Sequence, residues 1–161
     1  RFPRTYKGLD QVSGDWPKTP VVAGAKIDVD FLATAAHNPS VWDVWMTKAS
    51  WDPNTPLRWS EMEFLGRPQA TYSPSYYKFK VQIPANRRGH HVLWIAWQRD
   101  DPVGEGFLST CDILVRPQND ECTGAITVRD GHNGSFSTKG ARPGAPTATC
   151  GGAGGADVWF S

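Results

Sequence analysis

The sequence predicts an all-β protein whose strands form an antiparallel β-sandwich. Residues 26–31 and 76–83 alternate between apolar and polar side chains, which is typical of strands with one buried face. Residues 91–98 are almost continuously apolar and too short for a typical helix, so they indicate a strand covered on both faces. The sequence is also rich in Trp, Gly and Pro, with 8, 16 and 13 residues, and it shows no amphipathic helical period.

Two more strands complete the expected sandwich. Residues 42–46 and 107–115 are apolar enough to join the three segments above, and Pro84 ends the second segment because proline cannot donate to a strand ladder. Residues 1–19 show no period and residues 51–74 hold four prolines, so both are expected to be mainly irregular. The predicted core contains Val29, Phe79, Val92 and Ile95, together with the tryptophans Trp42, Trp45, Trp94 and Trp97.

A change in composition after residue 116 predicts a domain boundary. Residues 1–116 are expected to form the sandwich, and residues 117–161 are expected to begin a second β-rich module, with strands at 125–128 and from Asp157 onward. The chain opens at Arg1 and closes at Ser161 within an expected strand. We therefore interpret it as an internal piece of a longer protein.

Charge and cysteines restrict the partners and the compartment. A net charge of +1 gives no strong attraction to nucleic acid or anionic membrane, and no apolar run reaches the ~18 residues of a membrane span. We expect Cys122 and Cys150, which both fall in the later module, to form a disulfide, and Cys111 to stay unpaired. A disulfide fits a secreted protein.

Four stretches between residues 21 and 115 resemble the bacterial-type lytic polysaccharide monooxygenases, also called chitin-binding proteins (auxiliary activity family ten). They are residues 33–37 (Ala-Thr-Ala-Ala-His), residues 44–48 with Trp51-Asp52, residues 83–92, and residues 97–112. The resemblance implies an immunoglobulin- or fibronectin III-like sandwich. It also implies a secreted, monomeric bacterial enzyme that uses copper and an external electron donor to cleave insoluble polysaccharide oxidatively. Residues 119–161 resemble the start of an accessory module of bacterial secreted proteins.

The same resemblance implies a copper site that this chain holds only in part. The family binds one copper ion in a "histidine brace", formed by the amino group and ring of an N-terminal histidine and by the ring of an internal histidine. By match, His37 is the internal ligand, Phe107 the axial aromatic residue, and Arg99 and Glu105 a polar pair beside the open copper position. Nitrogen ligands of this kind suit Cu(II). Position 1 is Arg, so the brace is incomplete and the chain alone is expected to be inactive.

The strand pattern also predicts where the site lies. His37 ends one strand region and Phe107 begins another, so both should lie at one exposed end of the sandwich, with Glu105 nearby. Adjacent strand residues point to opposite faces, so His90 and His91 should not share a metal ion, and His132 should be a solvated turn residue.

Plainer interpretations remain beside these assignments. Outside the motif, His37 is a loop histidine, Phe107 a core residue, and Arg99 with Glu105 a solvated ion pair. The alternative functions are a non-catalytic carbohydrate-binding module and a structural part of a larger exported protein. Between substrates, residues 104–107 (Gly-Glu-Gly-Phe) favour chitin over cellulose, because they resemble chitin-active relatives.

Overall fold

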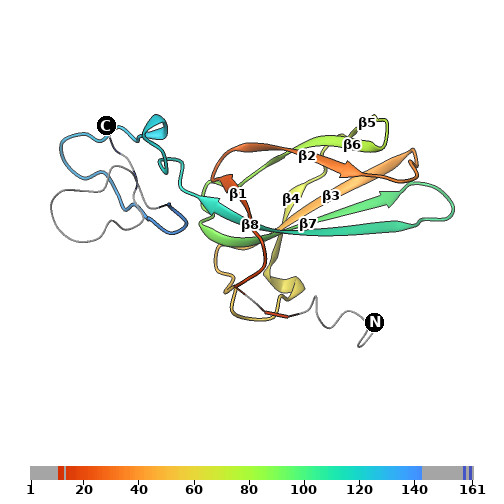
Figure 1. Ribbon diagram of the computed structural model, residues 1–161, viewed down its shortest axis with the longest axis horizontal. Coiled ribbons are helices and arrows are strands. Elements are labelled where there is room, and N and C mark those ends of the chain that lie inside the picture. The colour runs from red at the N-terminus through yellow and green to blue at the C-terminus, as the bar shows by residue number, and fades with distance from the viewer. Residues whose placement is uncertain (1–10, 13, 143–157, 159, 161) are drawn as a thin grey trace.

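The computed structural model describes residues 11, 12, 14–142, 158 and 160, and it shows two β-sheets packed face to face (Figure 1). The larger sheet has the order β1 (Thr19–Val22), β8 (Gly106–Arg116), β7 (Gly89–Arg99), β3 (Ser40–Thr47) and β4 (Met62–Gly66). The smaller sheet has the order β2 (Lys26–Leu32), β6 (Tyr76–Gln82) and β5 (Thr71–Ser73). The β-sandwich and the all-β class predicted from the sequence are confirmed. Within the described residues, no helix is long and apolar enough to cross a membrane.

Each of the five strands expected for the sandwich is present, and the structure adds three short ones at the sheet edges. β4 and β5 lie in residues 51–74, together with a 3-10 turn, Trp59–Glu61, so the prediction of a mainly irregular connection there was wrong in part. β1 pairs in parallel with β8, whereas every other strand pair is antiparallel. Pro20 is tolerated in β1 because this strand is at the edge of its sheet.

The segment after residue 116 differs from its prediction. Around residues 125–128 the structure shows only a single bridge, Ile126 to Phe160, and a 3-10 turn at Cys122–Gly124, instead of a strand. Cys111 is exposed and forms no disulfide within the described residues. The predicted bond between Cys122 and Cys150 concerns side chains outside the described residues, and the domain boundary after residue 116 stays a prediction.

The core lies between the two sheets and is built around aromatic rings. Trp42 and Trp97 are 2% and 3% exposed and stack with their ring centroids 5.4 Å apart. Phe79 and Ile95 are buried, as predicted, and Val29 is partly buried against the same cluster.

Three residues predicted for the core lie on the outer face of the larger sheet instead. In β7 the buried residues are the odd-numbered ones, so Val92 and Trp94 point away from the core, as Trp45 does in β3. These tryptophans form an outer cluster with ring contacts of 4.7–5.2 Å, composed of Trp45, Trp59, Phe64 and Trp94. The continuous apolar run of β7 therefore reflects two differently covered faces, one deeply buried and one partly shielded by aromatic rings.

A buried polar group closes the end of the sandwich where β7 begins. His91 is 2% exposed, and its Nδ1 lies 2.8 Å from the Thr47 hydroxyl, which can donate to a neutral ring while accepting from the amide of Val92. Burial, and then the charges of Arg87 and Lys139, lower the pKa of His91 from 6.5 to about 4. His90 points to the other face, where its Nε2 lies 2.5 Å from Asp112, so the two histidines diverge as predicted.

The folded chain should lose stability as the pH falls from 7 to 5. His91 has a lower pKa when folded, so its contribution is complete above pH 6.5 and is lost as the pH falls toward 4, because the unfolded state takes up the proton first. This loss amounts to about 2 kcal/mol in the free energy of unfolding between pH 7 and 5. Urea denaturation of wild type and His91→Gln at both pH values measures it. The variant should lose about that much less, and equal losses would contradict a buried neutral imidazole.

The two faces of β7 should also respond differently to truncation. Ile95→Ala removes a side chain that is 5% exposed in the core and should cost about 3 kcal/mol. Val92→Ala removes a partly exposed side chain on the outer face and should cost about 1 kcal/mol. Chemical denaturation at pH 7 compares the two, and equal costs would show that both faces are packed alike.

Candidate functional site

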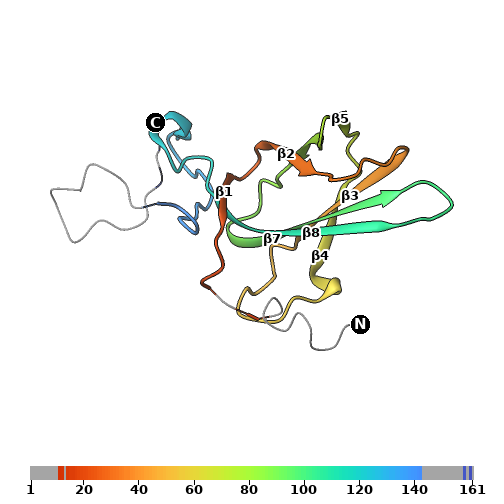
Figure 2. The ribbon, with the colours of Figure 1, turned by 45° about the vertical axis from the view of Figure 1, so that its right-hand side comes forward.

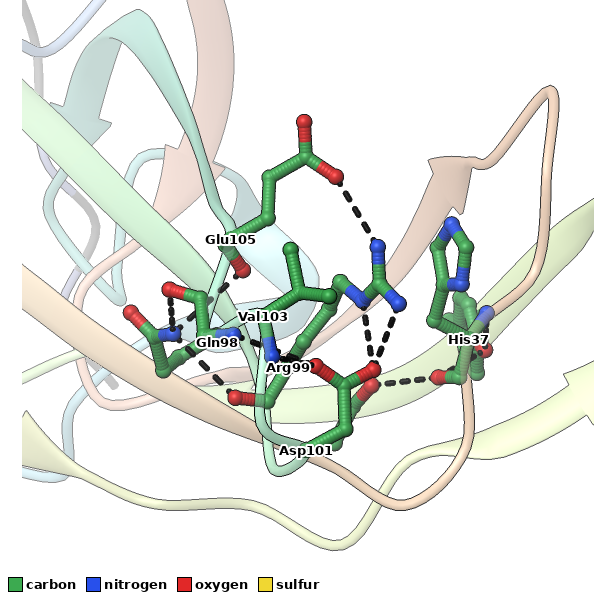
Figure 3. Close-up of polar contacts among 9 residues, drawn as sticks. His37, Gln98, Arg99, Asp101, Val103 and Glu105 are labelled. Atoms are coloured by element: carbon green, nitrogen blue, oxygen red, sulfur yellow. Dashed lines mark hydrogen bonds and ion pairs between the residues drawn. The ribbon is translucent and has the colours of Figure 1, made fainter.

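The loop between β2 and β3 carries His37, and hydrogen bonds to its main chain hold it in place. The Tyr77 hydroxyl accepts from the His37 amide at 3.0 Å and donates to the His37 carbonyl at 2.8 Å. The Ser40 hydroxyl also donates to that carbonyl, and the amide of Asp100 donates to the carbonyl of Pro39 at 3.0 Å. The His37 side chain is partly exposed, and none of the residues drawn in Figure 3 is hydrogen-bonded to its ring nitrogens. The hydrogen bonds of the main chain therefore fix the position of His37, and its ring nitrogens are available to bind a ligand.

Trp97 connects His37 to Phe107. Phe107, near the start of β8, pairs with Trp97 across the ladder, and the two rings stack at 4.7 Å between centroids. The Trp97 ring is also near His37, with 6.0 Å between the two ring centroids. Phe107 is 36% exposed, so it lies at the boundary between core and solvent. His37 and Phe107 thus lie at the same end of the sandwich, as the strand pattern predicts.

Arg99 and Glu105 meet across the turn that joins β7 to β8. Arg99 Nη1 donates to Glu105 Oε2 at 3.0 Å, and its amide donates to the Glu105 carbonyl at 3.0 Å (Figure 3). Ser40 pairs with Arg99 in the β3–β7 ladder, which brings this turn beside the His37 loop. All four residues assigned by the resemblance, His37, Arg99, Glu105 and Phe107, therefore lie at one end of the molecule.

Asp101 organises the same turn. Its Oδ2 accepts from Arg99 Nη2 at 2.6 Å, and its Oδ1 accepts from the amides of Val103 and Gly104 at 3.0 and 3.1 Å. Burial alone would raise the pKa of Asp101, but the hydrogen bond from Arg99 and those from the two amides hold it below its ordinary value. The hydrogen bond to Asp101 is likewise the main cause that raises the pKa of Arg99.

Two of these contacts were not predicted from the sequence. Asp101 could have been found from its turn, because Asp followed by Pro and then Gly is typical of a side chain that caps backbone amides. Tyr77 could not, since it lies 40 residues from His37 and its hydroxyl reaches the loop from β6, the strand that pairs with β2.

Other candidate metal ligands lie elsewhere. His90 and His91 are at the opposite end of β7, and His132 is exposed beyond the sandwich. Within the described part of the chain, no three His, Cys, Asp or Glu residues are arranged to hold a metal ion. His37 is thus a single imidazole donor at this end, and the metal-binding role of this residue set stays a prediction.

Comparison with known proteins agrees with this arrangement. The sequence profile of the family described as "Lytic polysaccharide mono-oxygenase, cellulose-degrading" matches residues 3–113. A lytic cellulose monooxygenase from Streptomyces ambofaciens is 30% identical over 131 residues, which cover 77% of this chain and 35% of that protein. Chitin-binding protein CbpD from Pseudomonas aeruginosa is 30% identical over 113 residues, covering 67% of this chain and 29% of that protein.

A solved structure shows the same fold. The cellulose-active lytic polysaccharide monooxygenase CelS2, solved in complex with copper, superimposes with a TM-score of 0.57 and 30% identity, over 64% of this chain and 55% of that chain. The chain spans about a third of the length of the two curated relatives. A profile match over more than half of the chain, two relatives at 30% identity and a common sandwich lead to one conclusion: the chain belongs to the lytic polysaccharide monooxygenase family.

Proposed function

We propose that the whole protein is a copper-dependent enzyme that cleaves glycosidic bonds oxidatively in insoluble, crystalline polysaccharide. Chitin is the favoured substrate, because of the Gly-Glu-Gly-Phe form of residues 104–107, and cellulose is the alternative. Relatives named for each polysaccharide match the chain. The observation that carries the proposal is the placement of His37, Phe107, Arg99 and Glu105 at one end of a family-typical sandwich.

The chemistry of His37 fits one ligand of a copper site. Imidazole nitrogen is a preferred ligand of copper, and the His37 ring is partly exposed while its hydrogen bonds are made by the main chain. Copper, when bound, supplies the redox chemistry that activates oxygen or peroxide. We propose that an N-terminal histidine of the full-length protein provides the other nitrogen ligands, since no second described histidine lies at this end. On this proposal, residues 1–161 alone are inactive.

Phe107 and Glu105 would have different tasks at such a site. The Phe107 ring carries no donor atom, so beside a metal held by His37 it would fill space without acting as a ligand. The Glu105 side chain is 49% exposed. Its ion pair with Arg99, which is only 15% exposed, holds the carboxylate beside the turn between β7 and β8. From there a carboxylate can hydrogen-bond to an oxygen co-substrate.

The setting of the reaction follows from its substrate. A crystalline polysaccharide cannot enter a cell, so we propose that the full-length protein is secreted by a bacterium and acts as a monomer with an external electron donor. An exposed end of a sandwich can approach a flat crystal face, which a deep pocket could not do.

Non-catalytic binding of polysaccharide is the alternative, and one relative is named as a chitin-binding protein. A binding module holds the polysaccharide without changing it. The appearance of oxidised oligosaccharides therefore separates the two functions.

His37→Ala should abolish both copper binding and catalysis. In the full-length protein with its N-terminal histidine, the wild type should bind one Cu(II), measured by calorimetry, and release oxidised oligosaccharides from chitin, measured by mass spectrometry. The variant loses an imidazole ligand, so its affinity for Cu(II) should fall by at least about 100-fold. His132→Ala changes an exposed histidine outside the sandwich and should leave both measurements unaltered. Undiminished product release by His37→Ala would remove the central residue of the proposal.

Glu105→Gln should slow the reaction more than it weakens copper binding. The substitution keeps the size of the side chain but removes its charge and its ion pair with Arg99. We expect a fall of about 10- to 100-fold in the rate of product release. Asp100→Asn, at the neighbouring exposed carboxylate, is the matched control and should retain the rate. If Glu105→Gln releases product as fast as the control variant Asp100→Asn, Glu105 has no role in the reaction.

A further inference from the structure

We propose that Tyr77 is a positioning residue for the candidate metal ligand, holding the main chain of His37 so that its imidazole faces the site in one orientation. The inference rests on the proposed function in that it treats His37 as a copper ligand. The holding of the loop by Tyr77 is nonetheless a property of the structure that can be measured without metal.

The hydroxyl of Tyr77 makes its hydrogen bonds to the loop that carries His37. A tyrosine hydroxyl has one proton to donate and lone pairs to accept with. Here the oxygen accepts from the His37 amide at 3.0 Å, and the proton is donated to the His37 carbonyl at 2.8 Å, with Asn38 Oδ1 farther away at 3.2 Å. Both polar groups of the His37 backbone are thus bound by one side-chain atom.

The position of this hydroxyl is determined by the core rather than by the loop. Tyr77 is 2% exposed and lies on β6, the central strand of the smaller sheet. Its ring contacts Trp42 at 4.9 Å and Trp97 at 5.2 Å between centroids. Packed side chains of this kind move little, so the hydroxyl is a fixed anchor for a loop that otherwise runs over an exposed end of the sandwich.

The geometry connects this anchor to the orientation of the imidazole. Trp97 contacts both the Tyr77 ring and the His37 ring, so the main chain and the side chain of His37 are located by two neighbouring aromatic residues. A metal ligand with a defined backbone and a supported ring requires less ordering when the metal binds. Removal of the hydroxyl alone should therefore weaken metal binding without removing a ligand.

Two variants test the inference. Tyr77→Phe keeps the ring in the core and removes the oxygen. Tyr76→Phe is the matched control, because Tyr76 is the preceding residue of β6, is 39% exposed and alternates to the opposite face. The first measurement is amide hydrogen exchange by NMR in this chain, comparing His37 with core amides such as that of Ile95. The second is the Cu(II) dissociation constant of the full-length protein with its N-terminal histidine.

We expect Tyr77→Phe to speed exchange at the His37 amide by about tenfold while core amides keep their rates. We also expect a dissociation constant for Cu(II) that is about tenfold higher, with an altered EPR spectrum. Tyr76→Phe should change neither measurement.

Three results would overturn the role of Tyr77: unchanged exchange at His37, equal acceleration throughout the sandwich, or unchanged Cu(II) affinity despite faster exchange at His37. The second of these would mean that Tyr77 acts only as a core residue. Failure of the proposed function gives a different result. If His37→Ala binds Cu(II) as the wild type does, the copper assignment is wrong, and the exchange data still decide whether Tyr77 holds the loop.

Discussion

The packing of Trp97 is the interaction on which both the core and the candidate site depend. Its ring is 3% exposed and stacks on Trp42 between the two sheets, with an angle of 4° between the planes. The same ring stacks on Phe107 and lies beside His37. Because close-packed interiors transmit small displacements, the two site residues are located by the core itself. Figure 2 shows the long β7–β8 hairpin, on which Trp97 and Phe107 lie, reaching past the end of the smaller sheet.

A strand could be predicted from the sequence when its own residues show which face is buried. β2 and β6 were predicted nearly to their ends. A strand with one buried face alternates between apolar and polar residues, and this alternation is visible in the sequence. β1, β4 and β5 have only three to five residues each, too few to show a period. The assignment of Val92 and Trp94 to the core failed for another reason. Both faces of β7 are apolar, and only the position of the second sheet decides which one is the interior.

The candidate site shows the same division. Its four assigned residues came from a family resemblance, since no spacing within one sequence distinguishes a ligand histidine from any loop histidine. The contacts that support them, from Tyr77 and Asp101, depend on hydrogen bonds made from a neighbouring strand that is distant in sequence or within a folded turn. Position along the chain contains little information about such partners, and only the turn chemistry of Asp101 could have signalled one of them.

Histidines at the two ends of the β7 region are held in contrasting environments. His91 is enclosed, bonded to Thr47 and kept neutral by burial and nearby cations, so it is a structural element of the interior. His37 has its backbone fixed and its ring partly open to solvent. A coordination role requires this second condition, because a ligand nitrogen already committed to a protein partner must give that partner up before it binds a metal.

The ion pair between Arg87 and Glu63 affects how readily the edge strand β4 can pair with a second copy of the chain. β4 is the last strand of its sheet, it carries the exposed ring of Phe64, and the exposed ring of Trp59 lies in the turn just before it, a combination that favours edge-to-edge pairing with another copy. Glu63 is the second residue of this short strand, and the buried guanidinium of Arg87 pairs with its carboxylate, which is 48% exposed. A second edge that paired with β4 would have to strip water from this half-exposed carboxylate, and that cost works against fibril-like growth.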